Sequence, residues 1–269
     1  MEKETKINYG YIPPVIKPED HVLGQGKTPL ILLQHDGQWD KEIERIDEIQ
    51  KNAFIDSADC TGYGLENQIV PYMKRRYRLD VNYSERAIGI VAGTRPPGNS
   101  PDIVYQSNRS FGFIKNETLP FTEDIKTIEE FYSPDPLTFE IEEEGKKWKE
   151  QFEFFHEWVW SGNPTLEEKV HNMKVSLKYS TLAIDVYAWA TDENGIYIKL
   201  GQSNHWVCVY GYTDKGWKVY DSYDRSHKIY SFENDIGFCK RISIEKRESK
   251  PSKISFWQSI INFIKKIFK

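Results

Sequence analysis

Residues 203–223 have the sequence "SNHWVCVYGYTDKGWKVYDSY", which predicts two β-strands joined by a tight turn. Valine, tyrosine and tryptophan dominate both halves, and these side chains favour extended backbone. Residues 214–216 supply the turn. His205 begins the first strand and Asp221 ends the second, so an antiparallel hairpin brings the two side chains together. A carboxylate in that position holds one imidazole nitrogen and leaves the other for a further partner.

The sequence around this hairpin divides the chain into a helical first half and a strand-rich second half. Upstream, residues 60–77 and 83–93 carry apolar residues at helical spacing, and a third helix is expected from Pro101 to Phe111. Downstream, short β-branched and aromatic runs alternate with Gly, Asp and Asn. Besides the hairpin, these runs are "TLAIDVYAWA" (181–190), "KIYSF" (228–232) and "GFCKRISI" (237–244). We therefore expect an α+β fold in which helices pack on an antiparallel sheet or barrel.

The composition excludes several classes of protein. A formal net charge of −5 over 269 residues gives no general attraction to nucleic acid. The three cysteines are too few and too scattered for a disulfide framework or a zinc site, so we expect no metal and no cofactor. The first twenty residues lack the apolar run of a signal peptide. A cytoplasmic or virion-associated protein with free thiols is the resulting expectation.

The predicted domain covers residues 51–245, with a segment before it and an insertion within it. Residues 1–50 are punctuated by Pro and Gly and predict an extended arm. Within the domain, residues 122–168 predict an acidic, amphipathic and mostly helical insertion. Residues 123–157 contain twelve acidic residues and four lysines, with aromatic residues interleaved among them.

Residues 246–269 form a charged linker followed by a predicted cationic amphipathic helix. From residue 253 to residue 269, apolar side chains fall on one face, and four lysines occur with no acid. The apolar stretch is interrupted by polar residues and is shorter than the roughly 20 residues that span a bilayer. Two alternatives stay open. The helix packs on this domain or a partner subunit, or it lies on an anionic membrane surface.

A third chemical group complements the predicted His205–Asp221 pair. The stretch "DSADCTGYG" (56–64) places Cys60 at the start of a helix, where backbone N–H groups and the helix dipole favour a thiolate. Cysteine catalysis needs a thiolate, a base and a group that orients the base. His205 follows Cys60 at an interval within the roughly 130–150 residues typical of papain-like enzymes.

With these residues in place, the sequence from residue 50 to residue 244 resembles a divergent papain-like cysteine peptidase of the bacterial and phage branch. The match rests on "DSADCTGYG", "YSERAIGIVAG" (83–93), "NHWVCVYGY" (204–212) and "GWKVYDSY" (216–223). The resemblance implies a polypeptide substrate and an acyl-enzyme on Cys60, with His205 as acid and base. It also implies that Gly98, in "PPGNS", belongs to the substrate-binding loop.

Three departures from the family pattern concern the site. Asp221 stands where the family has asparagine, and Tyr223 stands where it has a tryptophan lid. Phe54 occupies the position of the oxyanion-hole glutamine, six residues before Cys60. Gln50 is the nearest upstream glutamine, and we assign it as the oxyanion donor together with the backbone N–H of Cys60.

Two alternative functions compete with this interpretation. The motif "DCTGY" (59–63) also resembles the Asp-Cys-Ser-Gly signature of NlpC/P60-type cell-wall endopeptidases, although that family has a much shorter interval between cysteine and histidine. The second alternative is a papain-like fold kept as a structural or interaction protein without activity, for example in a virus particle.

Overall fold

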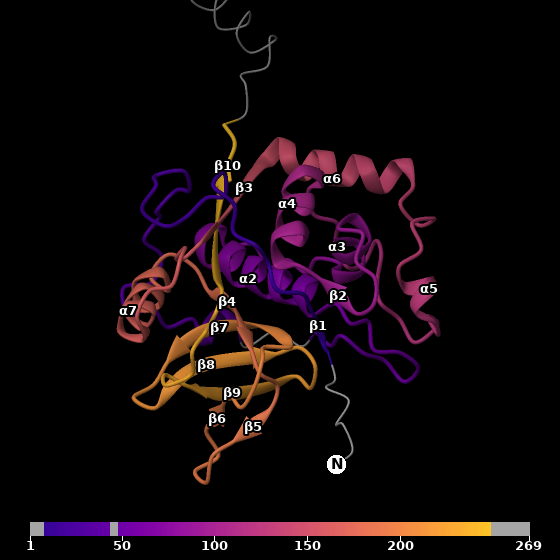
Figure 1. Ribbon diagram of the computed structural model, residues 1–269. Helices are drawn as coiled ribbons and strands as arrows, with labels where there is room; N and C mark the ends of the chain where they lie inside the picture. Colours follow the sequence, from indigo (N-terminus) through magenta and orange to yellow (C-terminus); the bar gives the residue numbers. More distant parts are fainter. Residues whose placement is uncertain (1–7, 44–47, 249–269) are drawn as a thin grey trace, which may run out of the picture.

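The computed structural model describes residues 8–43 and 48–248 (Figure 1). The helices are α1 (Asp40–Ile43), α2 (Cys60–Tyr77), α3 (Glu85–Val91), α4 (Pro101–Phe111), α5 (Ile128–Phe131), α6 (Phe139–Gln151) and α7 (Leu166–Ser176). The strands are β1 (Gly10–Tyr11), β2 (Gly98–Asn99), β3 (Phe152–Trp158), β4 (Leu182–Val186), β5 (Ala190–Thr191), β6 (Tyr197–Ile198), β7 (His205–Tyr212), β8 (Gly216–Asp221), β9 (Ser226–Ser231) and β10 (Cys239–Lys246).

The strands of the second half join one sheet in the order β3-β10-β4-β7-β8-β9-β6-β5. Neighbouring strands are antiparallel except β6 and β9, which pair in parallel. The predicted hairpin of residues 203–223 is β7 and β8, with a register shift between Val209 and Gly211. The α+β class and the strand-rich second half are therefore confirmed.

The helices of the first half begin where their capping residues predict. Asp59 caps α2 by accepting a hydrogen bond from the N–H of Gly62 at 3.3 Å. Ser84 caps α3 by accepting from the N–H of Ala87 at 2.9 Å, and α4 begins at Pro101. These local signals fix the start of each helix because they satisfy N–H groups that the first turn leaves unpaired.

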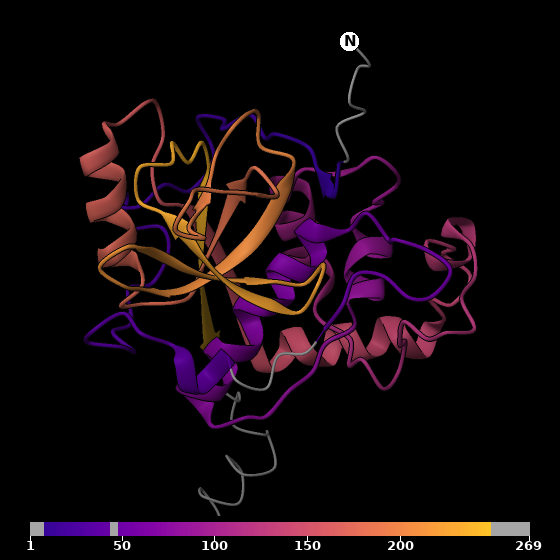
Figure 2. The same cartoon turned by 90° about the horizontal axis from the view of Figure 1, so that it is seen from below.

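Helix α2 lies between most of the sheet and the helices α3, α4 and α6 (Figures 1 and 2). It approaches β7 closely at Gly64, where an added Cβ would lie 2.5 Å from the indole of Trp206. One buried apolar cluster fills the space between the sheet, α1 and α7, and another joins α2, α4 and α6 to β3 and β10. The start of α2 and the start of β7 are thereby held in fixed positions.

The predicted acidic insertion at residues 122–168 is partly wrong. Residues 128–131 and 139–151 are helical, but residues 152–158 form β3, which pairs antiparallel with β10 at the edge of the sheet. Buried Phe152 and Phe154 alternate with half-buried Glu153 and Phe155 along this strand. Aromatic residues at a period of two favour a strand, so the aromatic content of the segment indicated extended backbone and not an amphipathic helix.

A buried lysine joins the two halves of the molecule. Lys240 on β10 is fully buried, and its Nζ lies 3.0 Å from Oδ1 of Asp102 at the start of α4. The same ammonium lies 3.1 Å from Nδ1 of His156 and 3.9 Å from the centre of the Trp158 ring. Burial lowers the pKa of Lys240 to about 8, against the opposing effect of Asp102.

This lysine makes stability depend on pH. An unfolded lysine has a pKa near 10.4, so below pH 8 the charged form costs the native state about 3 kcal/mol, and this cost fades between pH 8 and about 10.4. We compare the free energy of unfolding of Lys240→Met with that of the wild type by urea unfolding. The difference, variant minus wild type, is expected to fall by about 3 kcal/mol between pH 7 and pH 10.4. Lys246→Met, an exposed lysine on the same strand, is the control. If the difference in unfolding free energy between Lys240→Met and the wild type does not vary with pH, the lowered pKa of Lys240 is contradicted.

The structure describes part of the predicted N-terminal arm and none of the predicted C-terminal helix. The predicted amphipathic helix at residues 253–269 lies outside the described residues. The described part of the predicted arm includes β1 and the short helix α1. Within residues 8–43 and 48–248, no helix combines the length and hydropathy needed to cross a membrane.

Candidate active site

The structure brings His205 and Asp221 into contact, as the predicted hairpin requires. Nε2 of His205 lies 2.7 Å from Oδ1 of Asp221, and both side chains are fully buried. His205 begins β7 and Asp221 ends β8, so the hairpin sets their separation. An imidazole N–H donates to the carboxylate, which fixes the ring in one orientation.

Asp221 is held by more groups than the sequence indicated. Its Oδ2 accepts hydrogen bonds from the indole of Trp189 at 2.7 Å and from Nζ of Lys228 at 2.8 Å. Its Oδ1 also accepts from the backbone N–H of Tyr223 at 2.9 Å. Burial alone raises the pKa of Asp221, but the charges and hydrogen bonds of His205 and Lys228 outweigh burial and hold the pKa below its ordinary value. Asp221 is therefore a fixed anion.

Trp189 and Lys228 are site residues that sequence reasoning missed. Trp189 lies between β4 and β5, where no spacing pattern marks it. Lys228 carries a weak signal, because it shares the inner face of β9 with Tyr230 at a spacing of two residues. A lysine on the buried face of a strand requires a partner, and Asp221 is that partner. The predicted lid residue, Tyr223, lies beside the site, but the indole that contacts Asp221 belongs to Trp189.

Cys60 begins α2 and packs against β7, the strand that begins with His205. The backbone N–H of Trp206, the residue after His205, hydrogen-bonds to the sulfur of Cys60. Nδ1 of His205 has no hydrogen-bond partner among the described residues. The ring nitrogen that Asp221 does not hold is thus available to exchange a proton. The structure therefore brings His205 and Asp221 together and places Cys60 against Trp206, the next residue of the same strand.

The environment of Cys60 favours the thiol in this structure. Burial raises the pKa of Cys60 well above its ordinary value, and the hydrogen bond from Trp206 only partly offsets this. The carboxylates of Asp59, Asp56 and Asp221 raise it further. Burial also raises the pKa of Cys208 and Cys239, which lie in the core away from the His205–Asp221 pair.

Much of the burial at the site comes from residues 8–11 of the N-terminal arm. The ring of Tyr9 lies 5.1 Å from the His205 ring and 4.5 Å from the Tyr223 ring, between ring centres. Tyr11 is buried against Cys60, and its ring stacks on Trp206 at 5.8 Å. The arm therefore crosses the site above both the thiol and the imidazole.

The residue between these two tyrosines has no room for a side chain. Gly10 has a φ of +111°, and an added Cβ would lie 2.0 Å from the carbonyl oxygen of Ala58. On its other side, Gly10 pairs with Gly98 in the parallel β1–β2 ladder. Gly98 has a φ of +135°, and a Cβ there would lie 2.1 Å from the carbonyl oxygen of Gly10. The predicted substrate loop thus contacts an extended peptide, the chain's own arm.

Gln50, the predicted oxyanion donor, also contacts the arm. Its buried side-chain amide donates to the carbonyl oxygen of Tyr9 at 3.2 Å and to Oδ1 of Asp56 at 3.3 Å. The backbone N–H of Gln50 donates to the carbonyl of Ser222, which follows Asp221. The amide can therefore reach a peptide carbonyl that lies across the site.

Solved structures of similar fold are found for this chain, whereas the comparisons by sequence give no match. No family model and no curated protein sequence matches this chain. Xylellain, a cysteine protease from Xylella fastidiosa, is similar with a TM-score of 0.60 at 12% identity, covering 93% of this chain and 99% of that one. The bromelain protease of Ananas comosus, solved with the inhibitor E64, has a TM-score of 0.52 at 12% identity, covering 77% and 98%. Digestive procathepsin L 3 of Tenebrio molitor has a TM-score of 0.51 at 11% identity, covering 88% and 77%.

These structures share one fold, and the chain described above has it. The prediction of a papain-like fold, with a helix that begins at Cys60 packed on a sheet that carries His205, is confirmed. At identities of 11–12% the similarity concerns the fold.

Proposed function

We propose that this chain is a cysteine peptidase in which Cys60 is the nucleophile, His205 the acid and base, and Asp221 the group that orients His205. The observation that supports the proposal most strongly is the arrangement of the imidazole. One ring nitrogen binds a buried carboxylate, and the other has no partner in the described part of the chain, while the N–H of the next residue, Trp206, hydrogen-bonds to the Cys60 sulfur. This division of the two nitrogens is what a Cys–His pair requires.

In the proposed reaction, Nδ1 of His205 takes the thiol proton and the Cys60 sulfur attacks the carbonyl carbon of a peptide bond. The oxyanion is stabilised by the amide of Gln50 and the backbone N–H of Cys60. The C–N bond then breaks, and His205 gives its proton to the leaving amine. A water molecule attacks the thioester with His205 as base, which releases the acid and restores the thiol.

The arm has a direct role in this proposal. While residues 8–11 lie on Cys60 and His205, no substrate reaches the sulfur, and burial keeps the pKa of Cys60 high. Displacement of the arm opens the site to water and substrate, and it removes part of the burial that favours the thiol. The chain with its arm in place is therefore a latent form of the proposed enzyme.

Selective alkylation tests the proposed nucleophile. The folded protein is treated with iodoacetamide at neutral pH, and the modified cysteine is identified by peptide mass spectrometry after a short exposure. Cys60 is expected to react before Cys208 and Cys239, because it packs against the arm residue Tyr11, whereas the other two lie in the core cluster between the sheet and the helices α1 and α7. Reaction at Cys208 or Cys239 first would remove the proposed nucleophile, and an inert Cys60 with the arm displaced would favour a non-enzymatic interaction protein.

Gln50→Ala is expected to lower the turnover of an unfolded polypeptide substrate by roughly 10²-fold, because one of two oxyanion donors is lost. The Gln50 amide also binds the Tyr9 carbonyl of the arm, so turnover and alkylation are both compared in a Gly10→Ala background, which displaces the arm. There the alkylation rate of Cys60 should change little, since alkylation forms no oxyanion. Turnover is measured by release of new amino groups and stability by urea unfolding. Asn52→Ala, a nearby amide that bonds to the carbonyls of Thr122 and Ile125, is the control. A loss below about fivefold would mean that another donor completes the hole.

A further inference from the structure

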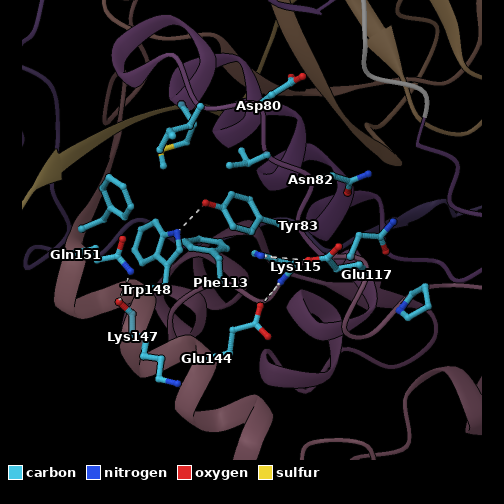
Figure 3. Close-up of a pocket in the computed structure, with 16 residues that line it drawn as sticks. Asp80, Asn82, Tyr83, Phe113, Lys115, Glu117, Glu144, Lys147, Trp148 and Gln151 are labelled. Carbon is cyan, nitrogen blue, oxygen red and sulfur yellow. Dashed lines mark hydrogen bonds and ion pairs between the residues drawn. The ribbon is translucent and has the colours of Figure 1, made fainter.

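A cavity lies away from the site around Cys60, and the proposed function does not use it. Its volume is about 800 Å³, and it lies between the end of α2, residues 113–120 and α6. Its aromatic floor includes Tyr83, Phe113 and Trp148 (Figure 3), and Phe152 also lines the cavity. The indole of Trp148 donates to the hydroxyl of Tyr83 at 2.8 Å, so the main polar groups of the floor already bind each other. What remains is an apolar surface of the kind that binds apolar side chains.

The rim of this cavity carries more acids than bases. Asp80, Glu117 and Glu144 line it together with Lys115 and Lys147. The ammonium of Lys115 lies 3.1 Å from the carboxylate of Glu117. Three carboxylates against two ammonium groups give these rim side chains a formal charge of −1. A basic, apolar segment matches both the floor and the rim.

The last described residues of the chain lie at the same rim. Strand β10 ends beside Phe152, with Lys246 paired to it. The backbone N–H of Arg247 then donates to the carbonyl of Gln151 at 2.7 Å, and Nε of Arg247 lies 3.4 Å from the carbonyl oxygen of Phe152. Gln151 and Phe152 both line the cavity. Whatever follows residue 248 therefore starts within reach of it.

We propose that residues 253–269 of this chain bind in this cavity. Residues 249–269 contain five lysines and no acid, and from Ile254 to Phe268 the apolar residues recur at the spacing of one helical face. The four residues 249–252 can extend up to about 14 Å. The apolar side chains then cover the aromatic floor, and the lysines face the acidic rim.

Hydrogen exchange of the full chain tests this proposal. In the double variant Ile260→Asp, Ile264→Asp, amide exchange at residues 79–83, 113–120 and 144–152 is expected to rise at least about tenfold over the wild type. Leu79→Lys, which places a positive charge at the cavity wall, should raise exchange at residues 144–152 in the same way. Leu200→Lys is the matched control for Leu79→Lys, since Leu200 lies outside the cavity and is 67% exposed where Leu79 is 40% exposed, and it should change nothing there. Unchanged exchange in both the double variant and Leu79→Lys overturns the proposal.

Two further measurements identify a different occupant. Light scattering of the full chain is expected to give a monomer, and a dimer that the double variant disrupts would assign the segment to a second copy. Vesicles containing anionic lipid are added at low salt in the same exchange experiment. A monomer in which residues 144–152 exchange as fast as in the double variant, and which binds these vesicles only when residues 260 and 264 are unchanged, would assign the segment to a membrane surface and overturn the proposal.

Discussion

Cys60→Ala is expected to abolish hydrolysis of an unfolded polypeptide, with a loss of at least about 10⁴-fold, while the fold is retained. The reason is that, in the proposed mechanism, His205 and Asp221 activate the Cys60 sulfur and have no nucleophile of their own. The small side chain at position 60 touches Tyr11 and Trp206 and carries no other structural bond. Activity is measured in the background of an open site, given by the Gly10→Ala substitution described next.

Cys208→Ala is the matched control for this loss. Cys208 is also fully buried, and its sulfur donates to the carbonyl of Asn67 at 3.3 Å, so its replacement tests the effect of removing a core thiol. Stability is expected to fall by about 1 kcal/mol, with turnover per folded molecule unchanged. Retained activity in Cys60→Ala together with an inactive Cys208→Ala would move the nucleophile to the other thiol.

Gly10→Ala is expected to raise the alkylation rate of Cys60 by at least about tenfold, because alanine disfavours a φ of +111° and its Cβ would meet the Ala58 carbonyl oxygen at 2.0 Å. The substitution alters no residue assigned to the reaction, so an increase reports the arm alone. The pH profile of alkylation should also move. Displacing the arm exposes Cys60, which lowers its pKa, so the midpoint of the profile is expected at a lower pH than in the wild type.

Val15→Ala is the control on the same arm, since Val15 is 76% exposed and its side chain can be shortened without touching the site. Its alkylation rate and pH midpoint should match those of the wild type. An unchanged rate in Gly10→Ala, with the fold intact by circular dichroism, would mean that the arm does not limit access to Cys60.

Local chemistry explains which parts of the fold were predictable. The starts of α2, α3 and α4 follow from Asp59, Ser84 and Pro101, because each signal acts within one helical turn. The β7–β8 hairpin is equally local, and it predicted the contact of His205 with Asp221. The His205–Asp221 part of the site was therefore predictable, because the short turn between β7 and β8 sets the distance between these two residues.

The parts that were missed depend on partners far along the chain. Strand β3 exists because β10, about ninety residues later, supplies its hydrogen bonds, and its acids Glu153 and Glu157 continued the acidic pattern of the helix before it. Trp189 and Lys228 reach Asp221 only after the whole sheet is assembled. The position of Gly10 against Ala58 and Gly98 likewise depends on the tertiary fold, since nothing in residues 8–11 indicates what they contact.

The covalent connection between the arm and the rest of the chain has a kinetic consequence. A segment tethered next to its own binding site has an effective concentration of order millimolar, whatever the concentration of the protein. Dilution therefore leaves the arm in place, and a free peptide competes only if it is abundant or binds far more tightly. Activation of such a molecule would be first-order in protein. It would require an event that acts on residues 8–11 themselves, such as cleavage within the arm, a ligand that pulls the arm away, or local melting of the β1–β2 pair.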